Sequence, residues 1–127
     1  MNYHNFEEDI HALVLELGQE YFAKGAVHDL EKTDAGWRAR VEGTASYNVT
    51  LGGTEGVDTW ICNCPYDHGP VCKHVAATLY AVRENVRSEF GDQLDALSEG
   101  QIRKLVSDQV LRSRRFAERV QEYFKQD

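Results

Sequence analysis

Cysteine, proline and methionine are scarce in this sequence, and no long apolar run occurs. Three cysteines, an odd number, are poor material for the disulfide framework of a small secreted scaffold. No apolar stretch approaches the ~20 residues that a membrane-spanning helix needs. The first residues are acidic where a secretory signal needs basic ones. We therefore predict a cytoplasmic protein that does not associate with membranes.

Basic residues are also in the minority, with 14 Lys and Arg against 21 Asp and Glu and a formal net charge of −7. The acidic excess lies in residues 1–100, which hold 17 acids and 7 bases, whereas residues 101–127 hold 7 bases and 4 acids. Lys and Arg supply most of the affinity of non-specific nucleic-acid binding because they neutralise phosphates. The charge balance therefore argues against nucleic-acid binding by the whole surface and leaves a local basic face as an alternative.

Regular hydrophobic periodicity is present along the chain. Apolar residues recur at spacings of three and four over residues 7–24, which predicts an amphipathic helix. Further on the period changes to two, which predicts an antiparallel sheet in which Trp37 is buried. Its four strands are expected at residues 27–31, 37–42, 47–51 and 57–61, with Gly, Asp and Ser in the turns between them.

Three more helices are predicted after the last cysteine. The apolar spacing indicates a helix over residues 73–89 that closes near Gly91. Ser98, with Gln101 three residues later, forms a capping-box pattern that begins the second helix. The third helix is expected at residues 113–125.

All three cysteines lie within thirteen positions, in the pattern C-x-C-x7-C-x-H formed by Cys62, Cys64, Cys72 and His74. Alternate side chains of an extended chain point the same way, so the first two cysteines can face one ion. The second pair would enter from the loop and the first turn of the following helix, completing the four ligands of a tetrahedral zinc site. We therefore predict one structural Zn²⁺ as the cofactor.

A second histidine, His68, lies between the two ligand pairs and would also complete a Cys₃His set. Ligand type alone does not choose between His68 and His74. We favour His74 because a single residue separates it from Cys72, so that the two form a pair like the first one.

The stretch "WICNCPYDHGPVCKHVAATLYAV" resembles the SWIM zinc finger: C-x-C, a variable loop, and C-x-H followed at once by an apolar helix. The resemblance extends upstream through "GQEYFAKGAVHDLEKTDAGWRARVEG", covers roughly residues 18–88 and points to a small stand-alone, bacterial-type member. It implies a β-β-α zinc core with the ligands Cys62, Cys64, Cys72 and His74. It also implies binding to DNA or to other proteins, because the family occurs in chromatin-remodelling helicases, transposases and partners of recombinase paralogues. No helicase or transposase motif is present, so those activities are not implied.

The predicted fold is α+β, with an N-terminal helix, a small antiparallel β-meander, a zinc-clamped β-β-α finger and a C-terminal helical hairpin. A SWIM-type zinc-binding domain is expected at residues 1–91. A helical extension at residues 92–127 is expected to pack on the same domain. This organisation suits the length of 127 residues, which is near the modal size of one domain.

The predicted function is a zinc-binding module with a structural zinc, acting as a protein-interaction or adaptor domain in a DNA-related complex. Direct binding of DNA or RNA through a basic face near the finger is the alternative, and the acidic net charge favours the adaptor. A zinc- or cysteine-dependent enzyme ranks third, because the motif fills all four zinc positions and catalytic zinc keeps one open. The deaminase pattern H-x-E is absent, since Val75 and Ala76 follow His74. No small-molecule substrate is inferred.

Candidate partner contacts lie around the finger. Two arginines share one strand face, three further basic residues lie near the finger, and three residues belong to the loop between the ligand pairs, which the zinc is expected to hold in one shape. These contact residues are Arg38, Arg40, Lys73, Arg83, Arg87, Tyr66, Asp67 and His68.

The C-terminal helices carry several large apolar side chains, among them Leu111, Phe116, Tyr123 and Phe124. Core packing is the commoner explanation of such residues. If they form an exposed stripe, they mark a contact with a partner or a dimer contact, because monomers rarely show large apolar patches.

Overall fold

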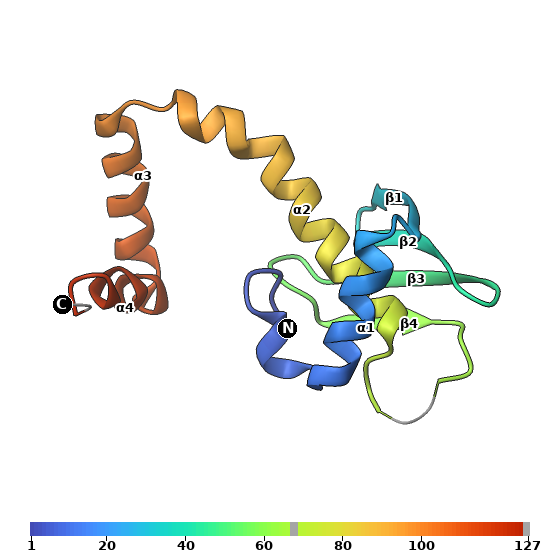
Figure 1. The fold of residues 1–127 in the computed structure, drawn as a ribbon. Helices are drawn as coiled ribbons and strands as arrows, with labels where there is room; N and C mark the ends of the chain where they lie inside the picture. The colour runs from blue at the N-terminus through green and yellow to red at the C-terminus, as the bar shows by residue number, and fades with distance from the viewer. Residues whose placement is uncertain (67–68, 126–127) are drawn as a thin grey trace. The chain divides into compact units, whose positions relative to one another are not determined.

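The computed structural model describes residues 1–66 and 69–125 (Figure 1). It has the predicted α+β class and divides into two compact units, Met1–Ser88 and Glu89–Asp127. The elements in chain order are the 3₁₀ helix η1 (Phe6–Asp9), α1 (Ala12–Ala23), β1 (Val27–Lys32), β2 (Gly36–Glu42), β3 (Ser46–Gly52), β4 (Thr59–Cys62), α2 (Lys73–Ala96), α3 (Glu99–Arg112) and α4 (Arg114–Glu122).

The sheet of the first unit is an antiparallel meander with strand order β1-β2-β3-β4. Alternate residues of β2 face inward, so that Trp37 and Val41 are buried while Arg38 is exposed. The period of two in the sequence therefore predicted the four strands to within two residues at each end, with the inner face of β2 correct, whereas β4 begins at Thr59 and not at residue 57. The register between β1 and β2 shifts after His28, and Asp29 at this bulge has a φ of 55°.

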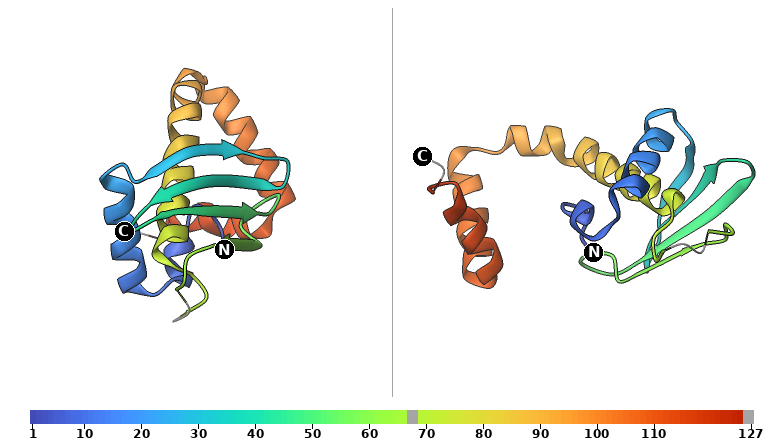
Figure 2. Two further views of the ribbon diagram at one scale, coloured as in Figure 1. Left: turned by 90° about the vertical axis from the view of Figure 1, so that its right-hand side faces the viewer. Right: turned by 60° about the horizontal axis from the view of Figure 1, so that its bottom comes forward.

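Helices α1 and α2 lie on the same side of the sheet, which makes the first unit a two-layer structure (Figure 2). The core between the layers combines the inward residues of the sheet with one face of α2 and with the N-terminal segment. Its largest fully buried side chains are Phe6, Leu51, Leu79, Val41, Val49, Val57, Val75, Val82 and Thr78. This core is the platform on which the end of β4 and the start of α2 are held.

Small residues allow α1 and α2 to approach closely. Gly18 is buried in α1, and a Cβ atom built on it would lie 2.5 Å from Cβ of Ala76 and 3.0 Å from the backbone nitrogen of Ala77. Because helix backbone lies so near, a larger residue at this position has no room.

We expect Gly18→Val to destabilise the first unit by about 1–3 kcal/mol through overpacking. Thermal unfolding followed by tryptophan fluorescence measures this, since Trp37 lies in the same core. Gly91→Ala is the control, because Gly91 is helical with nothing within 4 Å of an added Cβ. An unchanged midpoint for Gly18→Val would contradict the predicted close contact of the two helices.

Three predicted helix boundaries are wrong, one of them at the last helix, which ends at Glu122 and not at residue 125. The first helix does not run from residue 7, because Ile10 is extended and Nδ1 of His11 accepts the N–H of Leu13 at 3.2 Å, which caps a new helix at that point. Helix α2 does not close near Gly91 but continues to Ala96. Gly91 has no positive φ, and the residues around it are good helix formers that offset its cost of about 1 kcal/mol.

The second unit contains the end of α2 and the helices α3 and α4. The predicted capping box is confirmed: the hydroxyl of Ser98 accepts the N–H of Gln101, and the Gln101 side chain accepts the N–H of Ser98. Ser113 ends α3 and caps α4 by accepting the N–H of Phe116 at 3.2 Å. That residues 92–127 pack on the first domain stays a prediction. Within the described residues, no helix is long and apolar enough to cross a membrane.

Candidate metal centre

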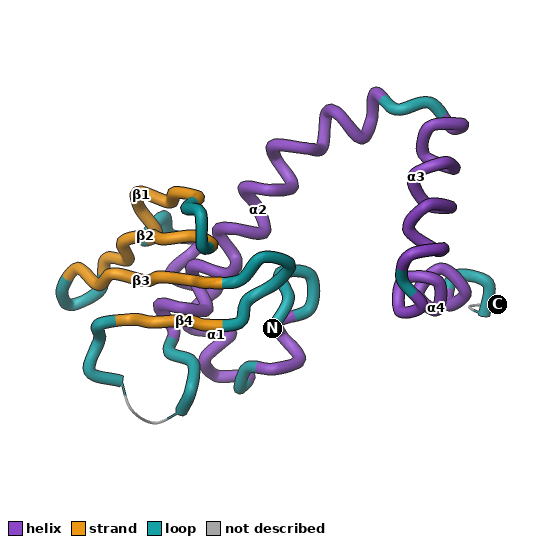
Figure 3. Tube along the Cα trace, turned by 180° about the vertical axis from the view of Figure 1, so that it is seen from behind, coloured by secondary structure: helices purple, strands orange, loops and turns teal. Residues whose placement is uncertain are grey.

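The four predicted ligands come from two elements of the first unit and the long loop that joins them (Figure 3). Cys62 is the last residue of β4, Cys64 follows two residues later, Cys72 directly precedes α2, and His74 lies in the first turn of α2. The residue between the first two cysteines faces elsewhere, as predicted. Oδ1 of Asn63 accepts the N–H of Asn48 on β3 at 2.8 Å, which fixes the strand end that presents the cysteines.

The ligand atoms converge on one point. The three Sγ atoms and a ring nitrogen of His74 all lie within 4.8 Å of one another. Nδ1 of His74 is 3.8 Å from Sγ of Cys62 and 3.9 Å from Sγ of Cys72. A tetrahedral zinc with ordinary bond lengths separates sulfur from nitrogen by about 3.6 Å. The positions of the four ligand atoms therefore fit a four-coordinate zinc site with only small shifts of the side chains.

The chemistry of the donor set agrees with this geometry. Three thiols and one imidazole are a standard structural zinc set. The N–H of Val75 points to Sγ of Cys72 at 3.5 Å, where it can stabilise negative charge on a thiolate. The ion would be held by His74, Cys72, Cys62 and Cys64. It would link the end of β4 to the start of α2.

The imidazole of His74 is held tightly in place and is 4% exposed. The ring of Tyr47 lies 4.4 Å from it at a shallow angle, and the ring of Tyr21 meets it edge-on at 5.5 Å. With Nδ1 toward the sulfurs, Nε2 lies near Gly43, where an added Cβ would come within 3.4 Å of it. Among the described residues Nε2 has no hydrogen-bond partner. The ring is thus oriented by packing, with Nδ1 as the ligand atom.

Burial controls the protonation of the ligands in the metal-free protein. It raises the pKa of Cys62 to about 12 and also raises the pKa of Cys72. Burial acts in the same direction on Cys64, but the N–H of Tyr66 and the neighbouring thiols outweigh it and lower the pKa of Cys64. Burial, aided by the charge of Lys73, lowers the pKa of His74 and keeps it neutral. Zinc binding therefore releases protons from the thiols.

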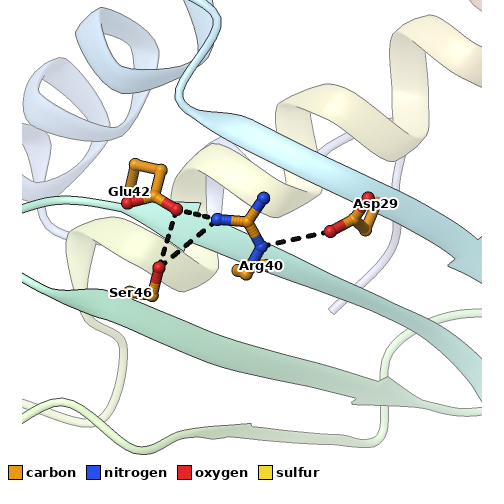
Figure 4. Close-up of polar contacts among 4 residues, drawn as sticks. All are labelled: Asp29, Arg40, Glu42 and Ser46. Atoms are coloured by element: carbon orange, nitrogen blue, oxygen red, sulfur yellow. Dashed lines mark hydrogen bonds and ion pairs between the residues drawn. The ribbon is translucent and has the colours of Figure 1, made fainter.

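Two of the predicted contact arginines lie on the outer face of the sheet and are paired with acids. Nη2 of Arg38 donates to Glu31 at 2.7 Å. Arg40 donates to Asp29 at 3.1 Å and to Ser46 at 3.3 Å, and it forms an ion pair with Glu42 (Figure 4). Arg38 is thus engaged by a carboxylate on the adjacent strand β1.

The other predicted contact residues lie in separate surroundings. Nη1 of Arg83 donates to Glu7 at 2.7 Å, and this bond lowers the pKa of that carboxyl group. Nζ of Lys73 lies 5.2 Å from the centre of the Tyr21 ring. Arg87 is exposed. Tyr66 is 38% exposed in the loop. Asp67 and His68 lie outside the described residues, so that the alternative ligand His68 and these two contacts stay predictions.

A groove beside the finger was not foreseen from the sequence. It has a volume of about 490 Å³ and lies between α1 and the loop that joins the two ligand pairs. Leu13 and Leu17 line one side and are 63% and 43% exposed, while Tyr66 and Pro70 line the other. Both leucines belong to the apolar pattern that predicts the first helix, but α1 packs through Val14 and Gly18 and leaves the two leucines at the surface.

Comparison with known families agrees with the site. Residues 47–83 match the family model of the SWIM zinc finger, and this segment contains β3, β4, the loop and the first turns of α2. Neither the search of curated proteins nor the search of solved structures gave a match. The matched segment holds the converging Cys₃His cluster, and SWIM fingers are structural zinc-binding domains. Residues 47–83 of this chain thus match the SWIM zinc finger, and Cys62, Cys64, Cys72 and His74 within them are positioned to bind one zinc ion.

Proposed function

We propose that this chain is an adaptor whose zinc finger holds a protein-binding groove in shape, and that it acts in a DNA-related complex. The observation that carries the proposal is the apolar groove between α1 and the finger loop. The SWIM finger supports the setting, because the family resemblance implies contact with DNA or with proteins that work on it.

The groove has the character of a protein-binding site. Its walls are mostly apolar, with two exposed leucines on α1 opposite Tyr66 and Pro70. Exposed apolar surface of this kind is typical of contacts in which a partner inserts an apolar side chain. One wall belongs to the loop between the two ligand pairs, so zinc binding and groove shape are coupled.

The described charges favour a protein partner over nucleic acid. Arg38, Arg40 and Arg83 each pair with at least one carboxylate. An arginine that is already paired contributes less to phosphate binding, since that binding requires the pair to be broken. Together with the net charge of −7, this places direct DNA or RNA binding second.

The same site supports a structural role for the metal. Three thiolates and one imidazole occupy all four positions of a tetrahedral ion, whereas a catalytic zinc keeps an open position for water or substrate. The proposed role of the ion is therefore to fix the loop and the start of α2, with no part in a reaction.

Co-purification with a tagged chain tests the adaptor function. We expect the zinc-loaded protein to retain a specific partner after nuclease treatment, and Leu13→Asp to lose it, because a carboxylate in the groove disfavours an apolar contact. Ile61→Asp is a matched control, since Ile61 is 67% exposed on the outer face of β4. Zinc content and thermal unfolding verify that both variants are folded.

Loss of the partner from both variants, or from neither, would contradict the groove as the binding site. A nuclease-sensitive association would instead support the alternative function. In that case, short DNA should bind with a strong dependence on salt concentration, and Arg38→Ala should weaken this binding.

A further inference from the structure

The helices of the second unit present large apolar side chains that no described residue of that unit buries. Neither α3 nor α4 contains a buried residue. On α3, Ile102 is 44% exposed and Leu105 is 56% exposed. After α4, Tyr123 is 75% exposed and Phe124 is 79% exposed.

These side chains form one stripe on each helix. With 100° between successive residues, Ile102, Leu105 and Val106 fall on one side of α3. By the same rule Phe116 and Val120 share one side of α4, where contact with α3 leaves them half-buried and not fully covered. The helices themselves are well specified by the caps at Ser98 and Ser113. Since helices of 14 and 9 residues are marginal in water without tertiary packing, the stripes need a partner surface.

The charges of this unit are divided into two blocks of opposite sign. Residues 89–99 hold four acids and no base, whereas residues 100–125 hold seven bases and three acids. In the described part of the unit, the ion pairs are Arg103 with Glu99 and Arg114 with Glu118, both between neighbours on one helix. Most of both blocks is therefore available for an intermolecular contact.

We propose that the second unit is a self-association module, in which the apolar stripes of α3 and α4 are covered by a second copy of this chain. A two-fold interface brings the acidic block of one copy against the basic block of its partner, and does so twice. A second copy thus supplies the apolar surface and both complementary charges at once. This inference is independent of the groove on the first unit.

Sedimentation of the full zinc-loaded chain over a range of concentrations tests the proposal. We expect a dimer in wild type and a rise of about tenfold or more in the dissociation constant for Leu105→Asp, because a buried anchor is lost. Leu111→Asp is the matched control. Leu111 is 86% exposed but lies on the opposite side of α3 from Ile102, nine residues away, so the dimer should persist.

Charge reversal tests independently whether a second copy of this chain covers the stripes. We expect Asp92→Lys with Asp95→Lys, and separately Arg115→Glu with Arg119→Glu, to weaken self-association, because each double variant brings the net charge of one block to zero and removes its attraction to the opposite block. An equimolar mixture of the two should form a heterodimer, since the unchanged acidic block of one variant then meets the unchanged basic block of the other, and the introduced lysines meet the introduced glutamates. High salt should weaken all of these charge effects.

If something other than a second copy covers the stripes, these experiments give different results. A wild-type protein that stays monomeric at all concentrations overturns the proposal and assigns the stripes to another protein or to the rest of the chain. A dimer that is unaffected by Leu105→Asp, or a mixture that forms no heterodimer, overturns it as well. The groove is tested separately with Leu13→Asp. A result that contradicts one proposal therefore does not contradict the other.

Discussion

Replacing Cys72 with serine is expected to release the zinc and to unfold most of the first unit. Cys72 is buried, and its sulfur lies among the other ligand atoms beside a core that includes Val75 and Leu79. Zinc binding in structural sites of this kind contributes about 10–16 kcal/mol of apparent free energy, whereas a whole domain is stable by only about 5–15 kcal/mol. Loss of even part of that energy is therefore comparable to the total stability. Elemental analysis and thermal unfolding measure the two effects.

A chelator and two histidine variants serve as controls for this prediction. A strong chelator should bring the wild type to the state of Cys72→Ser and should have no further effect on the variant. His74→Ala should also lose zinc, whereas His68→Ala should retain it. A Cys72→Ser protein with full zinc content and an unchanged midpoint would refute the Cys₃His site, and zinc loss from His68→Ala alone would make His68 the ligand.

Replacing Phe6 with alanine is expected to destabilise the first unit by about 3–5 kcal/mol. Phe6 is fully buried, its ring meets Tyr80 edge-on at 5.0 Å, and the guanidinium carbon of Arg83 lies 4.5 Å from the ring centre. Truncation leaves a cavity at the point where the N-terminal segment packs on α2, and the rigid helix cannot close it. Chemical denaturation followed by tryptophan fluorescence gives the free energy of unfolding.

The neighbouring ion pair provides the control for the Phe6 prediction. Glu7→Gln removes the carboxylate that accepts from Arg83 at 2.7 Å but leaves the packing of Phe6 intact. Because the Glu7 side chain is 41% exposed and the pair lies at the surface, we expect a loss of less than about 1 kcal/mol. If Glu7→Gln cost as much as Phe6→Ala, the ion pair and not the ring would secure this segment.

Features that depend on near neighbours in the chain were predictable from the sequence. The ligands Cys62 and Cys64 are two residues apart on an extended chain, and Cys72 and His74 are equally close, so spacing alone indicated a shared ion. The strands followed from the period of two in the hydrophobic pattern. The capping box at Ser98 is a contact over three residues and was predicted for the same reason.

Features that depend on competing local signals were predicted less well. The periodicity of the first helix could not show that His11 caps a new helix and separates it from η1. Gly91 is a helix stop only when the chain adopts a left-handed conformation there, and in α2 the neighbouring helix formers prevail. Each error concerns a boundary at which two weak preferences of similar size oppose each other.

The ligand pairs, the class of the fold and the order of its elements could be predicted from the chain alone, because they rest on short spacings and on hydrophobic periods of two to four residues. How the exposed side chains are used became apparent only once the elements were packed against one another. Folding brings Arg83 to Glu7 across 76 positions of the chain and places Leu13 in a groove instead of the core. It also sets the register of two adjacent strands, which pairs Arg38 with Glu31. Such contacts depend on which elements meet and in which register, and local periodicity carries no information about either.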